Sequence, residues 1–78
     1  MFSKILRQLR TEHNLSQLEL GNELNLAQRT ISNYENGNRF PDELVLNLIA
    51  DYFDVSMDYL LGRTSLKKYT IKHIRKSK

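Results

Sequence analysis

The spacing of apolar residues predicts amphipathic helices along most of the chain. Over residues 2–12 the apolar positions recur at intervals of three and four, which places them on one face of a helix: Phe2, Ile5, Leu6 and Leu9. Ser16 stands three residues before Glu19, and in this arrangement the hydroxyl and the carboxylate each bond an unpaired backbone amide. A second helix is therefore expected over about residues 17–24, with three leucines available to the interior: Leu18, Leu20 and Leu24.

A third helix is predicted over residues 28–35, after a tight turn. Asn25 stands where such a turn needs a left-handed backbone, and asparagine is the best choice for that conformation after glycine. Ile31 and Tyr34 point to the interior, and Asn36-Gly37 ends the helix. The helices at 17–24 and 28–35 thus form a consecutive pair joined by a short turn.

Two more helices complete the predicted domain. Pro41, Asp42 and Glu43 indicate a helix start, because proline suits a first turn and acidic side chains there complement the helix dipole. This helix extends to about residue 53 and carries a broad apolar stripe: Leu44, Leu48, Ile49, Tyr52 and Phe53. Ser56 is placed to cap a last short helix, MDYLL, which stops at Gly62. The pattern as a whole predicts an all-α fold.

Length and composition argue against several classes of protein. Seventy-eight residues form one small domain, and the absence of cysteine excludes disulfides and thiolate metal sites. No apolar run approaches the roughly 18 residues of a membrane-spanning helix, and the start of the chain is not an export signal. There is no glycine-rich phosphate loop, metal-ligand cluster or catalytic Ser/His/Asp set. We therefore expect a cytoplasmic protein that is not an enzyme and uses no cofactor or metal.

The net charge of +3 conceals two regions of opposite sign. Residues 1–62 hold all nine acidic side chains and five of the twelve basic ones, whereas residues 63–78 hold the other seven basic ones. The placement of individual cations is therefore more informative than the total. The apolar spacing in the basic segment fits neither a helix nor a strand well, so its conformation stays open.

The consecutive helices at 17–24 and 28–35 match the helix-turn-helix unit, whose second helix enters the major groove of DNA. Gly21 provides a small residue where the crossing helices come closest. The outer face of the second helix carries Gln28, Arg29 and Asn33, side chains that can form paired bonds with adenine or guanine edges. The alternative interpretation is the helical pair of any small bundle, with a solvated polar face.

Several motifs in combination resemble the phage repressor and Cro class of helix-turn-helix proteins, also called the XRE family: LSQ.EL at 15–20, IS.YENG at 31–37, Pro41, and IADYFDVSMDYLLG at 49–62. The resemblance covers about residues 2–62. It implies an all-α five-helix domain, here residues 1–62, that binds operator DNA, usually as a symmetric dimer and usually to repress transcription. Gly21 and Asn25 depart from the commoner alanine and glycine of the family.

The resemblance also implies roles for individual residues. The base-reading set is Gln17, Gln28, Arg29, Thr30 and Asn33, and the phosphate-binding set is Ser16, Asn36, Asn38 and Arg39. The loop around Gly37 can also bring backbone amides close to an anion, although NGNR is equally a plain turn sequence. Arg10 and Glu35 match positions that form a structural ion pair between the first and third helices.

The expected partners are double-stranded DNA and a second copy of the chain. One domain contacts about one half-site, so we expect a homodimer on a palindromic operator with half-sites about 34 Å apart or a multiple of that spacing. Met57 and Leu61 are predicted to lie near its two-fold interface, the alternative being that they close the core. RNA binding is disfavoured because Tyr34, Tyr52 and Phe53 occupy core-type positions.

Two further questions stay open in the sequence. A protein-interaction module such as an antitoxin, whose DNA binding is autoregulatory, is the competing function. The basic segment at residues 63–78 is a flexible arm, a linker toward a domain missing from this chain, or an ordered dimerisation element. We favour the arm, because its cations release counterions on approaching DNA.

Overall fold

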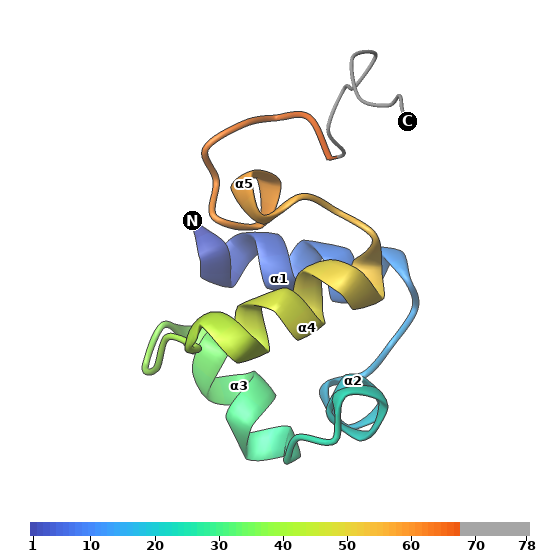
Figure 1. The fold of residues 1–78 in the computed structure, drawn as a ribbon. Coiled ribbons are helices and arrows are strands. Elements are labelled where there is room, and N and C mark those ends of the chain that lie inside the picture. Colours follow the sequence, from blue (N-terminus) through green and yellow to red (C-terminus); the bar gives the residue numbers. More distant parts are fainter. Residues whose placement is uncertain (68–78) are drawn as a thin grey trace.

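The computed structural model describes residues 1–67, which fold into five α-helices (Figure 1). The helices are α1 (Phe2–Glu12), α2 (Gln17–Leu24), α3 (Gln28–Asn36), α4 (Glu43–Phe53) and α5 (Met57–Leu60). The predicted all-α fold with five helices is confirmed. Residues 68–78, the larger part of the basic segment, lie outside the described residues.

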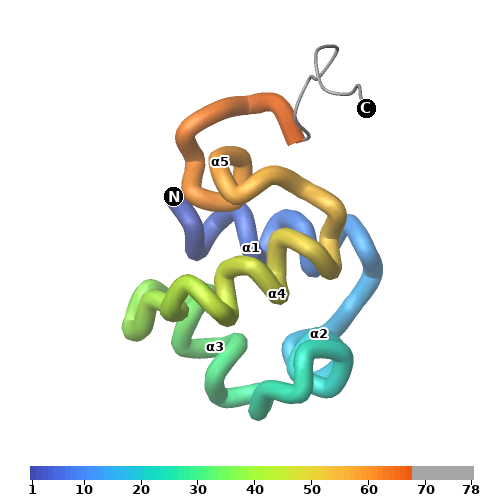
Figure 2. The backbone as a smooth tube through the Cα atoms, in the orientation of Figure 1, coloured from blue at the N-terminus to red at the C-terminus, as the bar shows by residue number. Residues whose placement is uncertain are grey.

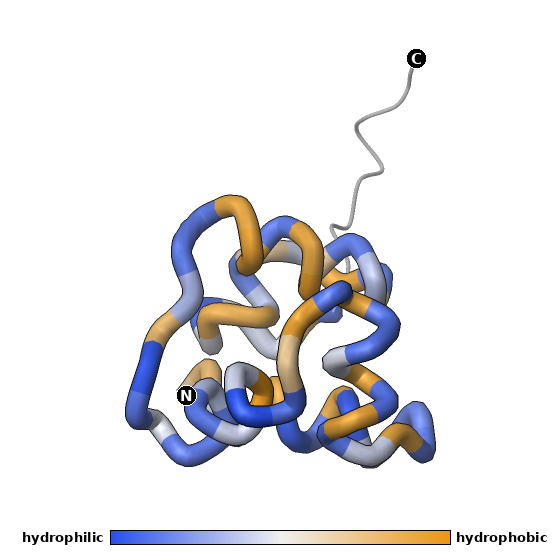
Figure 3. Tube along the Cα trace, turned by 90° about the horizontal axis from the view of Figure 1, so that it is seen from below, coloured by the Kyte–Doolittle hydropathy of each residue, from blue (hydrophilic) through white to orange (hydrophobic). Residues whose placement is uncertain are grey.

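The helices enclose a single apolar core. α1, α4 and α5 lie on one side of the domain and α2 and α3 on the other, as Figures 1 and 2 show. The core consists of these buried side chains: Phe2, Leu6, Leu9, Leu20, Leu24, Ile31, Tyr34, Leu46, Ile49, Ala50, Phe53 and Leu60. Hydrophobic and hydrophilic stretches alternate along the trace (Figure 3), as expected when each short helix turns one face inward.

Side-chain caps fix the first turns of α2 and α5. The Ser16 hydroxyl accepts a hydrogen bond from the Glu19 amide at 3.0 Å, and the Glu19 carboxylate accepts one from the Ser16 amide at 2.8 Å. The Ser56 hydroxyl accepts a hydrogen bond from the Tyr59 amide at 3.0 Å. Both predicted caps are confirmed, and they satisfy amides that have no partner within the helix.

The start of α4 differs from the prediction. Asp42 is the N-cap, and its carboxylate accepts a hydrogen bond from the Val45 amide at 3.0 Å. Pro41 is buried and precedes this cap, so the prediction that it lies in the first turn is wrong. The physical reason is that Asp42 can bond a free amide of the first turn, which makes it the stronger cap.

Left-handed residues end three of the helices. Asn25 ends α2 with φ 59° and ψ 40°, which confirms the predicted turn conformation. Gly37 ends α3 with φ 79°, and Asp54 ends α4 with φ 56°. Each such residue reverses the chain direction within a few residues, and this keeps the connections between helices short.

Replacing Asn25 with alanine is expected to lower the free energy of unfolding by about 1 kcal/mol, because a Cβ without a polar side chain disfavours the left-handed backbone. Asn25→Gly should leave stability within about 0.5 kcal/mol of the parent, because glycine adopts this backbone freely. Urea unfolding followed by circular dichroism measures both. An alanine variant as stable as the glycine variant would contradict the left-handed backbone conformation at residue 25.

Gly21 lies against the turn between α2 and α3. A Cβ built on this residue would stand 2.5 Å from the Leu26 carbonyl oxygen and 3.4 Å from the Gln28 nitrogen. The Leu26 amide also donates a hydrogen bond to the Gly21 carbonyl at 2.7 Å. The atoms closest to Gly21 therefore belong to the backbone of the turn between α2 and α3. The prediction instead expected the closest contact to be with the facing helix.

Some apolar positions predicted to face inward are exposed. Leu18 is 52% exposed, so its predicted interior position is wrong. The apolar stripe of α4 divides into a buried part and an exposed part, and the exposed side chains stand four residues apart: Leu44, Leu48 and Tyr52. Tyr52 is thus not a core residue, because α4 contacts the rest of the domain along a narrower face than its composition allows.

The first residues of the basic segment lie against the helices. The Arg63 amide donates to the Asp58 carbonyl at 2.8 Å, and the Ser56 amide donates to the Lys67 carbonyl at 2.6 Å. The Lys67 ammonium lies 3.2 Å from the Glu12 carboxylate at the end of α1. Within the part of the chain that the structure describes, no helix has the length and apolar character needed to cross a membrane.

Candidate nucleic-acid interface

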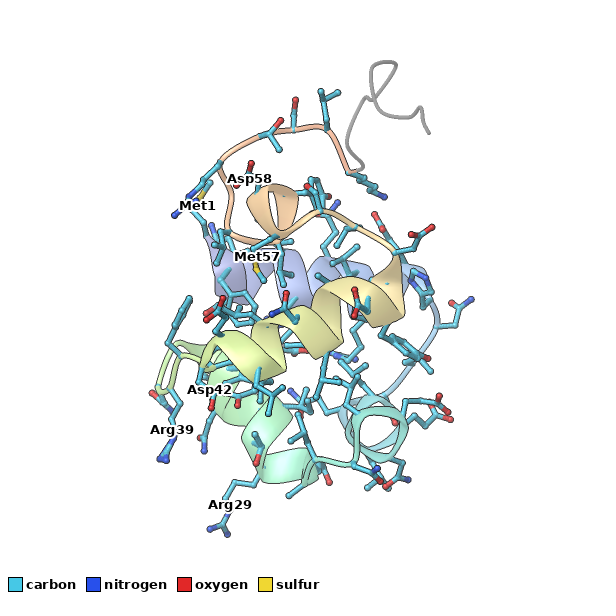
Figure 4. All side chains as sticks on the ribbon, viewed as in Figure 1. Met1, Arg29, Arg39, Asp42, Met57 and Asp58 are labelled. Carbon is cyan, nitrogen blue, oxygen red and sulfur yellow. The ribbon has the colours of Figure 1, made fainter. Side chains whose placement is uncertain are left out.

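The first turn of α3 presents polar side chains to solvent. Gln28 and Arg29 are exposed, and Arg29 projects away from the body of the domain at the end of α3 nearest the turn (Figure 4). Thr30 and Asn33 are half-buried on the same helix. Ile31 and Tyr34 are buried and anchor α3 to the core. The helix therefore holds its first polar residues in fixed positions on the surface.

The predicted phosphate-binding residues lie at two separate places. Ser16 stands at the start of α2, where its hydroxyl is already engaged as a cap. Asn36, Asn38 and Arg39 are exposed at the end of α3 and in the loop that follows, and Arg39 points away from the body of the domain in Figure 4. Arg39 is the cation of this loop, so attraction of an anion to this end of α3 rests on its side chain.

The backbone amides of the loop do not point outward. The Gly37 amide donates to the Tyr34 carbonyl at 3.3 Å, and the Asn38 and Arg39 amides donate to the Asn33 carbonyl at 2.9 and 3.3 Å. The expectation that backbone amides around Gly37 could bind an anion is therefore wrong, because these donors already have acceptors within the chain. Contact with an anion here depends on side chains.

A buried carboxylate connects α1 to α3. The side chain of Glu35 is fully buried, and its carboxylate accepts hydrogen bonds from Arg10 Nε at 2.6 Å and Arg10 Nη2 at 3.0 Å. Arg10 also donates from Nη1 to the Leu15 carbonyl at 2.8 Å. Arg7, half-exposed on α1, adds a longer contact of 3.4 Å to Glu35. This bidentate pair of Arg10 and Glu35 fixes the orientation of α3 relative to α1.

Arg7 was not among the predicted site residues. It lies three residues before Arg10, so both cations project from one face of α1. That spacing is the signal that could have identified it.

Gln17 belongs to the same network. Its side-chain amide donates to the Glu35 carboxylate at 3.2 Å, and the residue is half-buried at the start of α2. The structure therefore brings Gln17 into contact with the Glu35 carboxylate that also pairs with Arg10. The bond to a buried carboxylate leaves fewer donors of Gln17 for another partner.

The network changes the ionisation of both partners. Burial alone would raise the pKa of Glu35, but the hydrogen bonds from Arg10 and Gln17 outweigh it and lower this pKa below the ordinary value. The hydrogen bond with Glu35 raises the pKa of Arg10, against the opposing effect of burial. Both groups are therefore charged at neutral pH.

The predicted dimer residues are partly occupied by core contacts. Met57 and Leu61 are half-buried and pack against the apolar core. Figure 4 places Met57 beneath α5, toward α1 and α4. Only the exposed parts of these side chains are thus available to a second copy of the chain.

Two packed helices joined by a tight turn, with the second held so that its first turn faces solvent, define a helix-turn-helix domain. The family described as Helix-turn-helix matches residues 6–60. The chain belongs to this family, in the XRE class of DNA-binding transcription regulators.

Named relatives have different roles. The transcriptional regulator ImmR of Bacillus subtilis is 35% identical over 83% of this chain and 51% of its own length. The transcriptional activator BcrR of Enterococcus faecalis is 37% identical over 83% of this chain and 32% of its own length. The antitoxin PezA of Streptococcus pneumoniae is 29% identical over 85% of this chain and 42% of its own length. The chain thus spans about half or less of these relatives, and no solved structure matches it.

Proposed function

We propose that this chain binds double-stranded DNA in a sequence-specific manner and regulates transcription, with α3 in the major groove. The observation that carries the proposal is the exposure of Gln28 and Arg29 at the first turn of α3. In a helix-turn-helix domain the first residues of the second helix reach the base edges. We also propose that the chain acts in the cytoplasm of a prokaryotic cell.

We assign base contacts chiefly to Gln28 and Arg29, with Thr30 and Asn33 on the same helix as further base-reading residues. Arginine can bond guanine and glutamine can bond adenine through two atoms each. Asn36, Asn38 and Arg39 are proposed to contact phosphates through their side chains, and Ser16 through the start of α2. Gln17 is proposed to contact the DNA from the start of α2. Its hydrogen bond to Glu35 holds α2 against α3, and this supports its proposed contact.

Replacing Arg29 or Gln28 with alanine is expected to weaken binding to the preferred site by about 1–3 kcal/mol and to relax the preference at one base position. Affinity selection from a random duplex library at about 150 mM salt, followed by sequencing, defines the site. Lys4→Ala is the control, because Lys4 is an exposed cation of α1 that lies outside the base-reading and phosphate-binding sets. A folded parent protein that enriches no sequence would contradict specific DNA binding.

We further propose that the chain acts as a homodimer and represses transcription at a palindromic operator. Met57 and Leu61 belong to this interface through the exposed parts of their side chains. An isologous interface of this kind would place two copies of α3 on one face of the duplex, about one helical turn apart.

A charge at the interface is expected to separate the dimer. Leu61→Glu should lower the dimer population and weaken operator binding by about tenfold or more, while circular dichroism confirms that the helices remain. Sedimentation of the full chain, free and with an operator duplex, measures the mass. Leu66→Glu is the control, because Leu66 is 57% exposed and lies outside the proposed interface. A complex holding one chain per operator would contradict the dimer.

The similarity to the antitoxin PezA supports a second candidate function, neutralisation of a partner protein with autoregulatory DNA binding. Co-purification of an endogenous partner with the tagged chain, in a defined stoichiometry, distinguishes it. A regulator that acts alone is expected to purify without one.

A further inference from the structure

An open groove lies between α4 and the end of α2. It has a volume of about 620 Å³, and its walls come from α2, the turn after it and α4: Glu23, Leu24, Asn25, Leu26, Leu44, Val45, Leu48, Asp51 and Tyr52. None of these residues is in the proposed base-reading or phosphate-binding sets. The groove is therefore a separate feature of the domain.

One wall of the groove is an exposed apolar stripe of α4. Leu44 is 70% exposed, Leu48 is 43% exposed and Tyr52 is 36% exposed. Their spacing of four residues places them in one row on the helix surface. Adjoining apolar side chains in a concave surface are a feature of sites that bind another chain segment.

Acidic side chains stand beside this apolar wall. Glu23 and Asp51 both line the groove and are exposed. No cation among residues 1–67 lies within ion-pair distance of either carboxylate. Two copies of the groove facing each other would bring these like charges together, so the charge disfavours self-pairing and favours a basic occupant.

We propose that residues 68–78 of the same chain bind in this groove. These residues carry five basic side chains and no acidic one, with three apolar side chains between them: Tyr69, Ile71 and Ile74. Their composition thus matches both the apolar wall and the acidic rim. Lys67, the residue before this segment, already pairs with an acidic side chain, because its ammonium lies 3.2 Å from the carboxylate of Glu12 at the end of α1.

The position of Lys67 brings the segment within reach. Its carbonyl accepts a hydrogen bond from the Ser56 amide at 2.6 Å, and Ser56 follows closely on the end of α4. Tyr52 and Asp51 lie at that same end of α4. An extended segment of this length spans up to about 36 Å, more than twice the roughly 16 Å length of α4. The segment is therefore long enough to reach the groove and follow it along α4.

A spin label tests this placement in the full chain, without DNA. The chain has no cysteine, so Ser77→Cys gives one site for a nitroxide label. In the ¹⁵N-labelled protein the nitroxide should broaden the amide signals of residues 23–26 and 44–52 more than those of α3. Leu44→Ser combined with Leu48→Ser should reduce this broadening several-fold, because the apolar wall is lost. Leu18→Ser, which removes an exposed leucine outside the groove, should leave it unchanged.

Two results would overturn the proposal. One is an absence of selective broadening in the parent, or equal broadening over all faces of the domain. The other comes from a mixture of ¹⁵N-labelled chain without the nitroxide and unlabelled chain with it. Groove signals that broaden in this mixture as strongly as in the doubly labelled chain would assign the occupant to a second copy. The failure of either test leaves the DNA-binding proposal unaffected, because no DNA is present.

Discussion

Replacement of Gly21 with leucine is expected to lower the free energy of unfolding by about 3 kcal/mol, because the new side chain has no room beside the turn. A Cβ at this position would already stand 2.5 Å from the Leu26 carbonyl oxygen. That carbonyl belongs to a turn held by the Leu26 amide, which bonds the Gly21 carbonyl at 2.7 Å. The turn therefore cannot move away without losing a hydrogen bond that ends α2.

Urea unfolding followed by circular dichroism at the helix band measures this effect. Gly21→Ala provides a graded comparison, because its gain in helix propensity of up to about 1 kcal/mol offsets part of the steric cost. Asn22→Leu is the matched control, since Asn22 is the exposed neighbour on the same helix. A Gly21→Leu protein as stable as the Asn22→Leu protein would show that the turn yields at little cost.

Replacement of Glu35 with alanine is expected to cost about 3 kcal/mol at neutral pH, because it leaves the guanidinium of Arg10 near the core without its partner. The side chain of Arg10 is only 14% exposed, so water can solvate little of the unpaired positive charge. Arg7→Ala is expected to cost less than about 1 kcal/mol, because its contact of 3.4 Å is longer and its side chain is 55% exposed. If Glu35→Ala and Arg7→Ala lowered the free energy of unfolding equally, the pair between Arg10 and Glu35 would not be the main stabilising contact of this network.

The same carboxylate gives stability a dependence on pH. The pKa of Glu35 in the folded protein lies below its ordinary value of 4.5, so its ionised form stabilises the fold. This contribution is fully present above about pH 4.5 and is lost as the pH falls through the lowered pKa of the folded protein. Glu35→Gln should be less stable than the parent at pH 7, and the difference should shrink below pH 4. Urea titrations at both pH values measure the two free energies.

The local parts of the fold could be predicted from the sequence because they depend on neighbouring residues. The cap of Ser16 on Glu19 and the left-handed turn at Asn25 each involve residues within a few positions of one another. Turn and capping chemistry is set at that range. The sequence therefore contains enough information to delimit α2 and to place α3 after it.

Exposure could not be predicted in the same way. Leu18, Leu44 and Leu48 have the composition and spacing of core residues, yet all three are exposed. Whether such a side chain is buried depends on which helix lies opposite, and that is a property of the whole fold. The pattern along α4 is therefore broader than the face that the domain covers.

The Arg10–Glu35 pair expected from the family resemblance is present in the candidate site, whereas the bond from Gln17 to Glu35 was not predicted. Gln28 and Arg29 are exposed on α3, where the helix-turn-helix pattern placed them. The bond from Gln17 to Glu35 joins residues that are 18 positions apart, and no local pattern specifies it. Long-range polar contacts of this kind follow from the way the helices pack.

The carbonyl of Asn33 accepts bonds from the amides of both Asn38 and Arg39, and this ties the loop to the helix before any ligand arrives. The entropic cost of ordering the loop is thus incurred during folding. Association with an anion then has only the side chains left to immobilise, which reduces the loss of freedom that opposes binding. Arg39 and the first turn of α3 consequently approach a surface as one rigid unit.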